Sequence, residues 1–194
     1  MLEPQWGDRK PIMQTYREEK ATQAAAKLLS LSPKHKMNHV RLIKLLYLAD
    51  RQALINWGRT ITGDDYYSLR LGPILQCTLD LLNDEINPQA PSYWHKHISE
   101  RQGNEVRLLG EAPNDQLSSA EENLLQEIFD EHGKKNQWEL VKLTHDLPEW
   151  QDPGCSRLPI SIRRILSSEG FSESEILEIE NSISNKQSAN DLLT

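Results

Sequence analysis

The sequence has very little cysteine, with Cys77 and Cys155 as the two cysteines among 194 residues. A small secreted domain held together by disulfides carries several paired cysteines, so we expect this chain to work in a reducing compartment. Neither cysteine has a Cys or His partner at the spacing of zinc ligands, and the sequence has no P-loop or dinucleotide fingerprint. We therefore expect neither a metal site nor a cofactor.

Long uninterrupted apolar runs are also absent, which argues against a membrane-spanning helix. The first residues, MLEPQWGDRKP, lack the basic and then apolar pattern of a secretory signal. Apolar residues make up 37% of the chain and charged residues 26%, a balance that supports a folded core and argues against wholesale disorder. The length suits one domain, and we expect a cytoplasmic protein.

A basic face is not evident either, because the formal net charge is −7. Proteins that bind duplex DNA usually present clustered Lys and Arg to the phosphates, so nucleic acid is a disfavoured partner. Complementary charge steers association between proteins, and an acidic body is suited to a basic protein partner.

The longest apolar segment, residues 38–57, predicts a central helix. Asn38 suits its N-cap, and Gly58 suits the left-handed position that follows a helix. At about 100° per residue, apolar side chains cover most of the circumference, which is typical of a helix inside a bundle. The basic and polar residues fall on one narrow edge, formed by Arg41, Lys44, Arg51 and Gln52.

Asp50 is the exception, because it lies about opposite that edge on an apolar arc. A carboxylate there has a large desolvation cost unless it is bonded. One interpretation is a structural Asp that caps a neighbouring helix or holds an Arg such as Arg70, and we favour it because buried charges are usually paired. The alternatives are a functional carboxylate in a cleft, or a helix rotated so that Asp50 meets water.

A turn and a short strand follow the central helix. Residues 62–65, Thr-Gly-Asp-Asp, have the composition of a turn, and residues 66–71 are rich in strand formers. Gly72 and Pro73 predict a corner, with Pro73 in the first turn of a helix over 74–82.

The remaining pattern predicts further helices and one β-hairpin. The hairpin pairs 94–98 with 106–109 around a turn at 102–104. The expected helices lie at 15–31, 118–132 with a Ser118–Glu121 capping box, 138–147, 160–169, and from a second capping box at 172–175 to about 183. We expect a mainly α fold: a compact helical bundle around a central buried helix, with a small β-hairpin and short strands. Residues 15–183 form one domain, 1–14 a flexible leader and 184–194 a flexible tail.

The histidines do not form a recognisable catalytic or metal-binding pattern. His35, His95 and His97 lack a metal signature, and a solvated face is the favoured interpretation of the last two. His145 with Asp146 suggests a catalytic pair, but no Ser or Cys motif accompanies it, so a structural histidine is favoured.

Two blocks of sequence carry a family resemblance. The first joins Leu46–Asp50, Gly58–Asp64, Tyr66-Tyr67 and Gly72-Pro73. The second is Leu140–His145, followed by Trp150. Together they resemble the Panacea domain family, the SocA-like phage-associated antitoxins, over about residues 20–165. Arg70-Leu71 departs from the pair that many relatives carry there.

The resemblance implies a binding function. Such domains bind and neutralise protein toxins that are usually encoded by an adjacent gene, so stoichiometric occlusion is the expected mechanism. The SocA branch also implies a proteolytic adaptor that delivers the toxin to an ATP-dependent protease. A DNA-binding regulator of its own operon is a further alternative. The residues that match the family motif, and that we expect to be structural, are Tyr47, Asp50, Gly63, Gly72, Pro73, His145 and Trp150.

We expect partner contacts on the turn and strand after the central helix, because binding residues concentrate on loops held by rigid elements. The predicted contact residues are Trp57, Arg59, Thr62, Asp64, Tyr66, Tyr67 and Arg70. An open alternative is that Trp57 and one of the tyrosines close the core instead. We expect that this protein is not an enzyme. The spacing of Asp50, His145 and Asp64 or Asp65 does not match the pattern of a known catalytic reaction.

Overall fold

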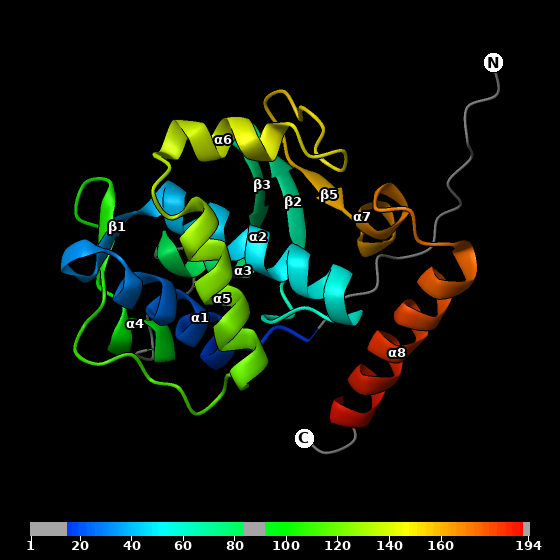
Figure 1. The fold of residues 1–194 in the computed structure, drawn as a ribbon, viewed down its shortest axis with the longest axis horizontal. Coiled ribbons are helices and arrows are strands. Elements are labelled where there is room, and N and C mark those ends of the chain that lie inside the picture. Colours follow the sequence, from blue (N-terminus) through cyan, green and yellow to red (C-terminus); the bar gives the residue numbers. More distant parts are fainter. Residues whose placement is uncertain (1–14, 84–91, 192–194) are drawn as a thin grey trace.

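The computed structural model describes residues 15–83 and 92–191, with side chains described as far as residue 185. The expected flexible leader, residues 1–14, lies outside the described residues. Within the described part of the chain, helices dominate and a few short antiparallel strands accompany them, which confirms the mainly α prediction (Figure 1).

The core is built around helix α2 (His39–Trp57), which lies in the middle of the bundle (Figure 1). Most of its side chains are buried, including every residue from Leu42 to Arg51. The helices that pack most closely against it are α1 (Glu18–Leu31), α5 (Ser119–His132), α6 (Gln137–His145) and α7 (Ile162–Ser168). A helix that is buried on nearly all sides must be apolar nearly all round, and this is the pattern that the sequence shows.

Two small antiparallel sheets complete the body. Strand β1 (Lys36–Asn38) pairs with β4 (Glu105–Arg107). The second sheet has the order β3-β2-β5, with β2 (Tyr66–Leu69) between β3 (Gly72–Leu75) and β5 (Leu158–Ile160). The remaining elements are the 3-10 turn η1 (Pro33–His35) and the helices α3 (Gln76–Leu82), α4 (Tyr93–His97) and α8 (Glu173–Asp191).

The predicted hairpin at 94–98 and 106–109 is wrong. Residues Tyr93–His97 form helix α4, because the Ser92 hydroxyl caps it by accepting from the His95 amide. Part of the expected pairing remains, as antiparallel bridges between Ile98 and Leu108 and between Gln102 and Glu105 around the predicted turn. Strand β4 instead pairs with β1, which lies far away in the sequence, and local turn signals carry no information about such a partner.

The predicted helix over 74–82 begins later than expected, because Gly72–Leu75 is strand β3 and α3 begins at Gln76. Pro73 tolerates this position, where it lies opposite Ser68. The expected helix over 160–169 is α7, which follows strand β5 and a Ser161 N-cap. Helix α8 continues to Asp191 instead of ending near 183.

The predicted helix ends with local signals are confirmed. The Asn38 side chain accepts from the amides of Val40 and Arg41, and Gly58 ends α2 with φ 62°. The Ser118–Glu121 capping box opens α5. The side chain and amide of Ser172 bond the Glu175 carboxylate at the start of α8. None of the described helices is both long enough and apolar enough to cross a membrane.

Candidate functional site

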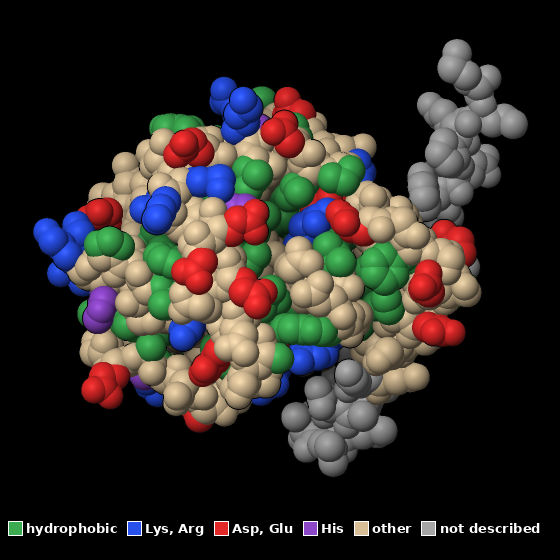
Figure 2. Space-filling model, viewed as in Figure 1, with side chains coloured by type: hydrophobic (Ala, Val, Ile, Leu, Met, Phe, Trp, Pro, Cys, Tyr) green, Lys and Arg blue, Asp and Glu red, His purple; other side chains and the backbone are tan. Residues whose placement is uncertain are grey.

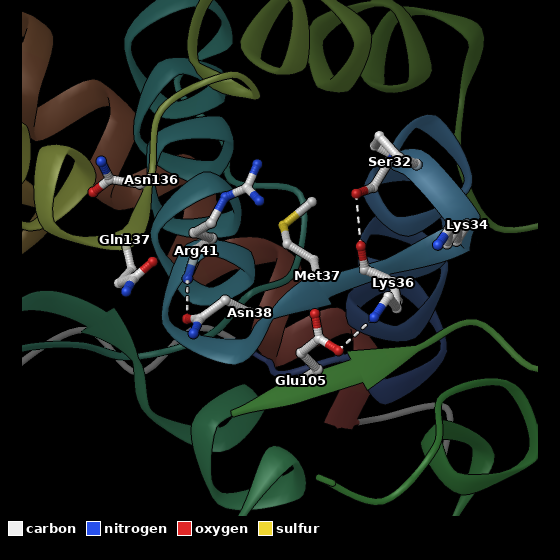
Figure 3. Close-up of a pocket in the computed structure, with 10 residues that line it drawn as sticks. Ser32, Lys34, Lys36, Met37, Asn38, Arg41, Glu105, Asn136 and Gln137 are labelled. Carbon is white, nitrogen blue, oxygen red and sulfur yellow. Dashed lines mark hydrogen bonds and ion pairs between the residues drawn. The ribbon is translucent and has the colours of Figure 1, made fainter. Parts of the chain in front are cut away.

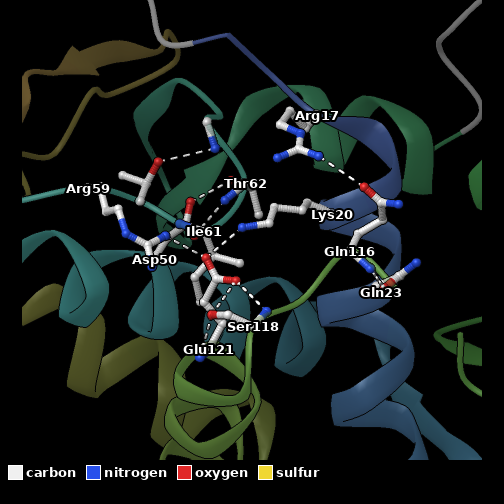
Figure 4. A network of polar contacts seen from close by, with 12 residues as sticks. Arg17, Lys20, Gln23, Asp50, Arg59, Ile61, Thr62, Gln116, Ser118 and Glu121 are labelled. Atoms are coloured by element: carbon white, nitrogen blue, oxygen red, sulfur yellow. Dashed lines mark hydrogen bonds and ion pairs between the residues drawn. The ribbon is translucent and has the colours of Figure 1, made fainter. Parts of the chain in front are cut away.

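Asp50 organises the turn that follows α2. Its carboxylate accepts hydrogen bonds from the amides of Ile61 (2.9 Å) and Thr62 (3.1 Å) and from the Thr62 hydroxyl (Figure 4). The side chain is almost completely buried, with 1% exposure, and burial raises its pKa to about 7. All of these partners belong to the fold, so the geometry supports the structural interpretation, with turn amides in place of the predicted Arg or helix terminus.

Asp64 plays the same part at the other end of the turn. Its oxygens accept from the amides of Cys77 and Thr78, each at 2.8 Å, and from the Thr78 hydroxyl at 2.7 Å. The carboxylate therefore caps α3 from a distant segment. Gly63, between the two carboxylates, has φ 70°, and a Cβ there would lie 2.2 Å from the Thr15 carbonyl oxygen. The turn consequently requires glycine at this position.

A buried ionic cluster ties α2 to the chain beyond α6. Glu149 is fully buried and accepts from the Tyr47 hydroxyl (2.8 Å) and from the Arg51 guanidinium (2.7 Å). Arg51 also bonds Glu169, which follows α7. Two residues of the basic edge of α2, Arg51 and Lys44, are buried, and both donate to acceptors from other elements. Arg41 remains partly exposed.

Lys44 lies beneath the Gly-Pro corner. Its ammonium donates to the Pro73 carbonyl oxygen at 2.7 Å, and burial lowers its pKa to about 7. Gly72 has φ 97°, and a Cβ there would lie 2.7 Å from Thr144 Oγ1 and 2.9 Å from Lys44 Nζ. The family motif has glycine here because α2, α6 and β3 meet at this point.

The end of α6 covers the same corner. The His145 and Trp150 rings are stacked, with centroids 3.9 Å apart and planes 13° apart. Trp150 Nε1 donates to the Leu69 carbonyl oxygen at 3.1 Å. Burial, and next the Lys44 cation, lower the pKa of His145. Since His145 packs against the sheet through Trp150, the structural interpretation fits it better than a catalytic one.

A groove of about 460 Å³ opens beside this corner. The start of α2, the β2–β3 turn, α3 and residues 154–156 supply most of its lining. Its aliphatic lining is formed by Val40, Ile43, Leu69, Leu71, Ile74 and Leu79. Lys44, Arg70 and Arg101 add positive charge, and among the described residues that line the groove none is Asp or Glu. An apolar groove edged by cations is suited to binding, since aliphatic contacts provide affinity and charges provide orientation.

A family model, described as antitoxin SocA-like, Panacea domain, matches residues 42–151. The match covers more than half of the chain, and it includes α2, the turn, the Gly-Pro corner and α6. The chain belongs to the SocA-like Panacea domain family. No curated protein and no solved structure matches it.

The Panacea match contains most of the groove. Ile43, Lys44, the β2–β3 turn and Arg101 lie inside the matched residues, whereas His39, Val40 and residues 154–156 lie just outside. The groove is therefore formed mainly by the family domain, and the flanking segments of this chain complete its rim.

The predicted contact residues of the Panacea domain divide into two groups. Thr62, Asp64 and Tyr66 are buried and support the fold. The side chains that reach the surface are those of Trp57, Arg59, Tyr67 and Arg70. Three of these four pack against their own chain. Arg59 lies over the Trp57 ring, and Arg157 lies over the Tyr67 ring. Arg59 also pairs with Glu121 at 2.6 Å (Figure 4).

Arg70 is the predicted contact residue that lines the groove. The role of all seven residues in binding stays a prediction. Sequence reasoning missed Lys44, Leu71 and Arg101 as groove residues. The signal available in the sequence was the pair Arg70-Leu71, which departs from the family pattern beside the Gly-Pro corner.

A second cavity, of about 430 Å³, lies between β1, η1 and the first residues of α2 and α6 (Figure 3). Three of its charged groups have partners within the chain, since Lys36 pairs with Glu105 at 2.7 Å and Arg41 donates to the Gly133 carbonyl. The groove beside the Gly-Pro corner is the better candidate, because its Arg70 side chain makes no ion pair with the described residues.

The charge of the groove differs from that of the surface elsewhere. Figure 2 shows Asp and Glu side chains spread over the face formed by α5 and α6 and over α8, in keeping with the net charge of −7.

The described residues contain no group of three or more His, Cys, Asp or Glu side chains placed to hold a metal ion.

Proposed function

We propose that this Panacea domain is an antitoxin-type binding module that neutralises a protein toxin by forming a direct complex with it. The family supports an antitoxin-like role. The proposal is for occlusion without catalysis, acting in the cytoplasm. The carboxylates that an enzyme could use, Asp50, Asp64 and Glu149, are buried and bonded to structural partners, which favours binding over chemistry.

The observation that carries the proposal is the groove beside the Gly-Pro corner. Six aliphatic side chains line it; Ile43 and Ile74 form its buried base, and Leu71 is exposed at its rim, in a chain whose large apolar side chains are mostly buried. Exposed apolar surface with a polar rim is typical of a protein-binding site. The groove is also held rigidly, because Lys44 and Trp150 bond the backbone of β3 and β2 on either side of the turn.

Co-expression with the neighbouring open reading frame of the source genome tests this function. We expect the neighbour alone to arrest growth, and this chain to restore growth and to co-purify with the neighbour in a stable complex. Rescue without a complex would contradict direct occlusion and would favour an enzymatic or proteolytic route. Absence of arrest by the neighbour would contradict the pairing of this chain with an adjacent toxin.

A matched variant locates the contact surface in the same assay. Leu71→Ser removes an exposed apolar side chain at the groove, whereas Leu177→Ser removes one from α8. We expect Leu71→Ser to weaken rescue and co-purification and Leu177→Ser to leave both unchanged. The reverse result would place the toxin contact on α8 and away from the groove.

A further inference from the structure

The groove has a local charge opposite to that of the protein. Three of its lining residues are Lys or Arg, and none of its described lining residues is acidic. The chain as a whole carries a net charge of −7. At physiological ionic strength, charges beyond about 8 Å are strongly screened, so groups inside the groove respond mainly to the cations that line it. The composition of the whole chain favours a basic partner, but the groove favours an acidic one.

The cations lie where a partner could reach them. The side chains of Arg70 and Arg101 are exposed, and neither pairs with a carboxylate among the described residues. Arg101 donates one hydrogen bond, to Asn83 at 3.1 Å. A guanidinium has five donors, so both groups retain the capacity for a two-pronged bond to a carboxylate.

The amine of Lys44 lies at the base of the groove. Lys44 is 1% exposed and donates to the neutral Pro73 carbonyl, and no carboxylate among the described residues forms an ion pair with it. Burial lowers its pKa to about 7, so near neutral pH the protonated and neutral forms are both present. An anionic group in the groove would favour the protonated form.

The apolar lining places a second requirement on the occupant. Leu69 of β2, Leu71 of the β2–β3 turn and Leu79 of α3 lie in the same groove and retain surface exposed to water. A small anion would leave these side chains uncovered, whereas aliphatic side chains would remove them from water at about 25 cal/mol per Å². An occupant that satisfies both requirements alternates acidic and aliphatic residues.

Resting on the proposed function, we propose that the groove receives an acidic and aliphatic segment of the partner protein. Its carboxylates pair with Arg70 and Arg101, and its aliphatic side chains fill the lining between them. Lys44 adds positive potential at the base. The net charge of −7 then opposes nonspecific binding of an acidic segment to the rest of the domain, which favours the groove.

Cys155 provides a direct reporter, because it is exposed and lines the groove. The full chain, labelled at Cys155 with an environment-sensitive fluorophore, is titrated with three short peptides of equal length. One alternates Glu and Leu, one alternates Lys and Leu, and one alternates Glu and Ser. We expect the Glu/Leu peptide to change the emission at the lowest concentration, because it alone meets both requirements.

Charge-reversal variants connect that signal to named residues. We expect Arg70→Glu with Arg101→Glu to weaken binding of the Glu/Leu peptide by at least about tenfold, as expected when close charge pairs are lost. Lys134→Glu, on the exposed loop after α5, reverses one charge outside the groove and should leave binding unchanged. A thermal melt within a few degrees of the wild type establishes that each variant is folded.

Several results would overturn the inference. No response to the Glu/Leu peptide, tighter binding of the Lys/Leu peptide, or equal binding by the double variant would each contradict it. A competition experiment tests the other reading. If a poly-dT oligonucleotide displaces labelled Glu/Leu peptide at a lower concentration than unlabelled Glu/Leu peptide does, the groove binds nucleic acid instead.

The toxin assay separates this inference from the proposed function. If the wild type rescues growth and the Arg70→Glu, Arg101→Glu variant rescues it equally well, the acidic-segment inference fails and the antitoxin function stands. If the wild type does not rescue growth, the function fails, and the peptide titration still decides the chemistry of the groove.

Discussion

The ammonium of Lys44 and the main-chain carbonyl of Pro73 lie 2.7 Å apart, and this contact joins the central helix to strand β3. Lys44 lines the groove, and His145 and Trp150 stack on each other at the same corner. The contact explains why a Gly-Pro pair is suited to this corner. Gly72 makes room for the approach of α2 and α6, and Pro73 offers its carbonyl while lacking an amide that would need a partner.

Substitution at Gly72 tests that close approach. We expect Gly72→Ala to lower the free energy of unfolding by about 2–4 kcal/mol, since the added Cβ would overlap Thr144 and Lys44 and the backbone has φ 97°. Gly110→Ala is the matched control, because Gly110 has φ 77° with open space around it and should cost about 1 kcal/mol. Urea unfolding measures both, and equal losses would contradict the role of crowding.

The buried amine of Lys44 predicts a pH dependence of stability. Its pKa is about 7 in the folded chain and 10.5 in the unfolded one. Between these values the unfolded state holds more protons, so this group makes the free energy of unfolding rise with pH, by at most about 1.4 kcal/mol per pH unit. Below pH 7 both states hold the proton, and the group contributes no slope.

Comparing the wild type with Lys44→Met isolates the pH dependence due to Lys44, because both proteins contain all the other titrating groups. We expect the wild type to gain stability relative to the variant as pH rises from 7 towards 10, measured by urea unfolding at several pH values. Lys142→Met, which removes an exposed lysine from α6, should follow the wild type. Parallel curves for wild type and Lys44→Met would show that Lys44 stays charged in the folded state.

We predict that Asp50 stabilises the folded state. Asp50→Ala leaves the amides of Ile61 and Thr62 buried without an acceptor, so we expect a loss of about 2–4 kcal/mol. Asp50→Asn keeps one acceptor oxygen and should lose less. Asp146→Asn, at an exposed position after α6, is the control. If Asp50→Asn kept its stability but lost toxin binding per folded molecule, the structural interpretation would be wrong.

The two cysteines are predicted to differ in reactivity. Burial raises the pKa of Cys77 to about 12, and Cys155 is exposed at the rim of the groove. Because the thiolate is the reactive form, we expect iodoacetamide to modify Cys155 at least about tenfold faster at neutral pH, as followed by mass spectrometry. In urea the two rates should converge. Comparable rates in the folded protein would contradict the burial of Cys77.

The parts of the candidate site that sequence predicted are those with local signals. The buried Asp50 followed from helical periodicity, and the glycines of the motif followed from turn chemistry and from the family resemblance. Helical periodicity placed Lys44 on the basic edge of the central helix, but periodicity gives the direction of a side chain and not the element that covers it. Arg101 lies far from α2 in the sequence, so no spacing rule connected the two.

The sequence by itself determined the central helix, its caps at Asn38 and Gly58, the capping boxes and the mainly α class. These features depend on contacts within a few residues, which composition and spacing encode directly. Tertiary structure alone decided that Lys44 and Arg51 are buried, that Pro73 lies in a strand, and that β1 pairs with β4. Each of these needs a partner from a distant segment, because a buried charge or a strand edge is stable only where another element satisfies it.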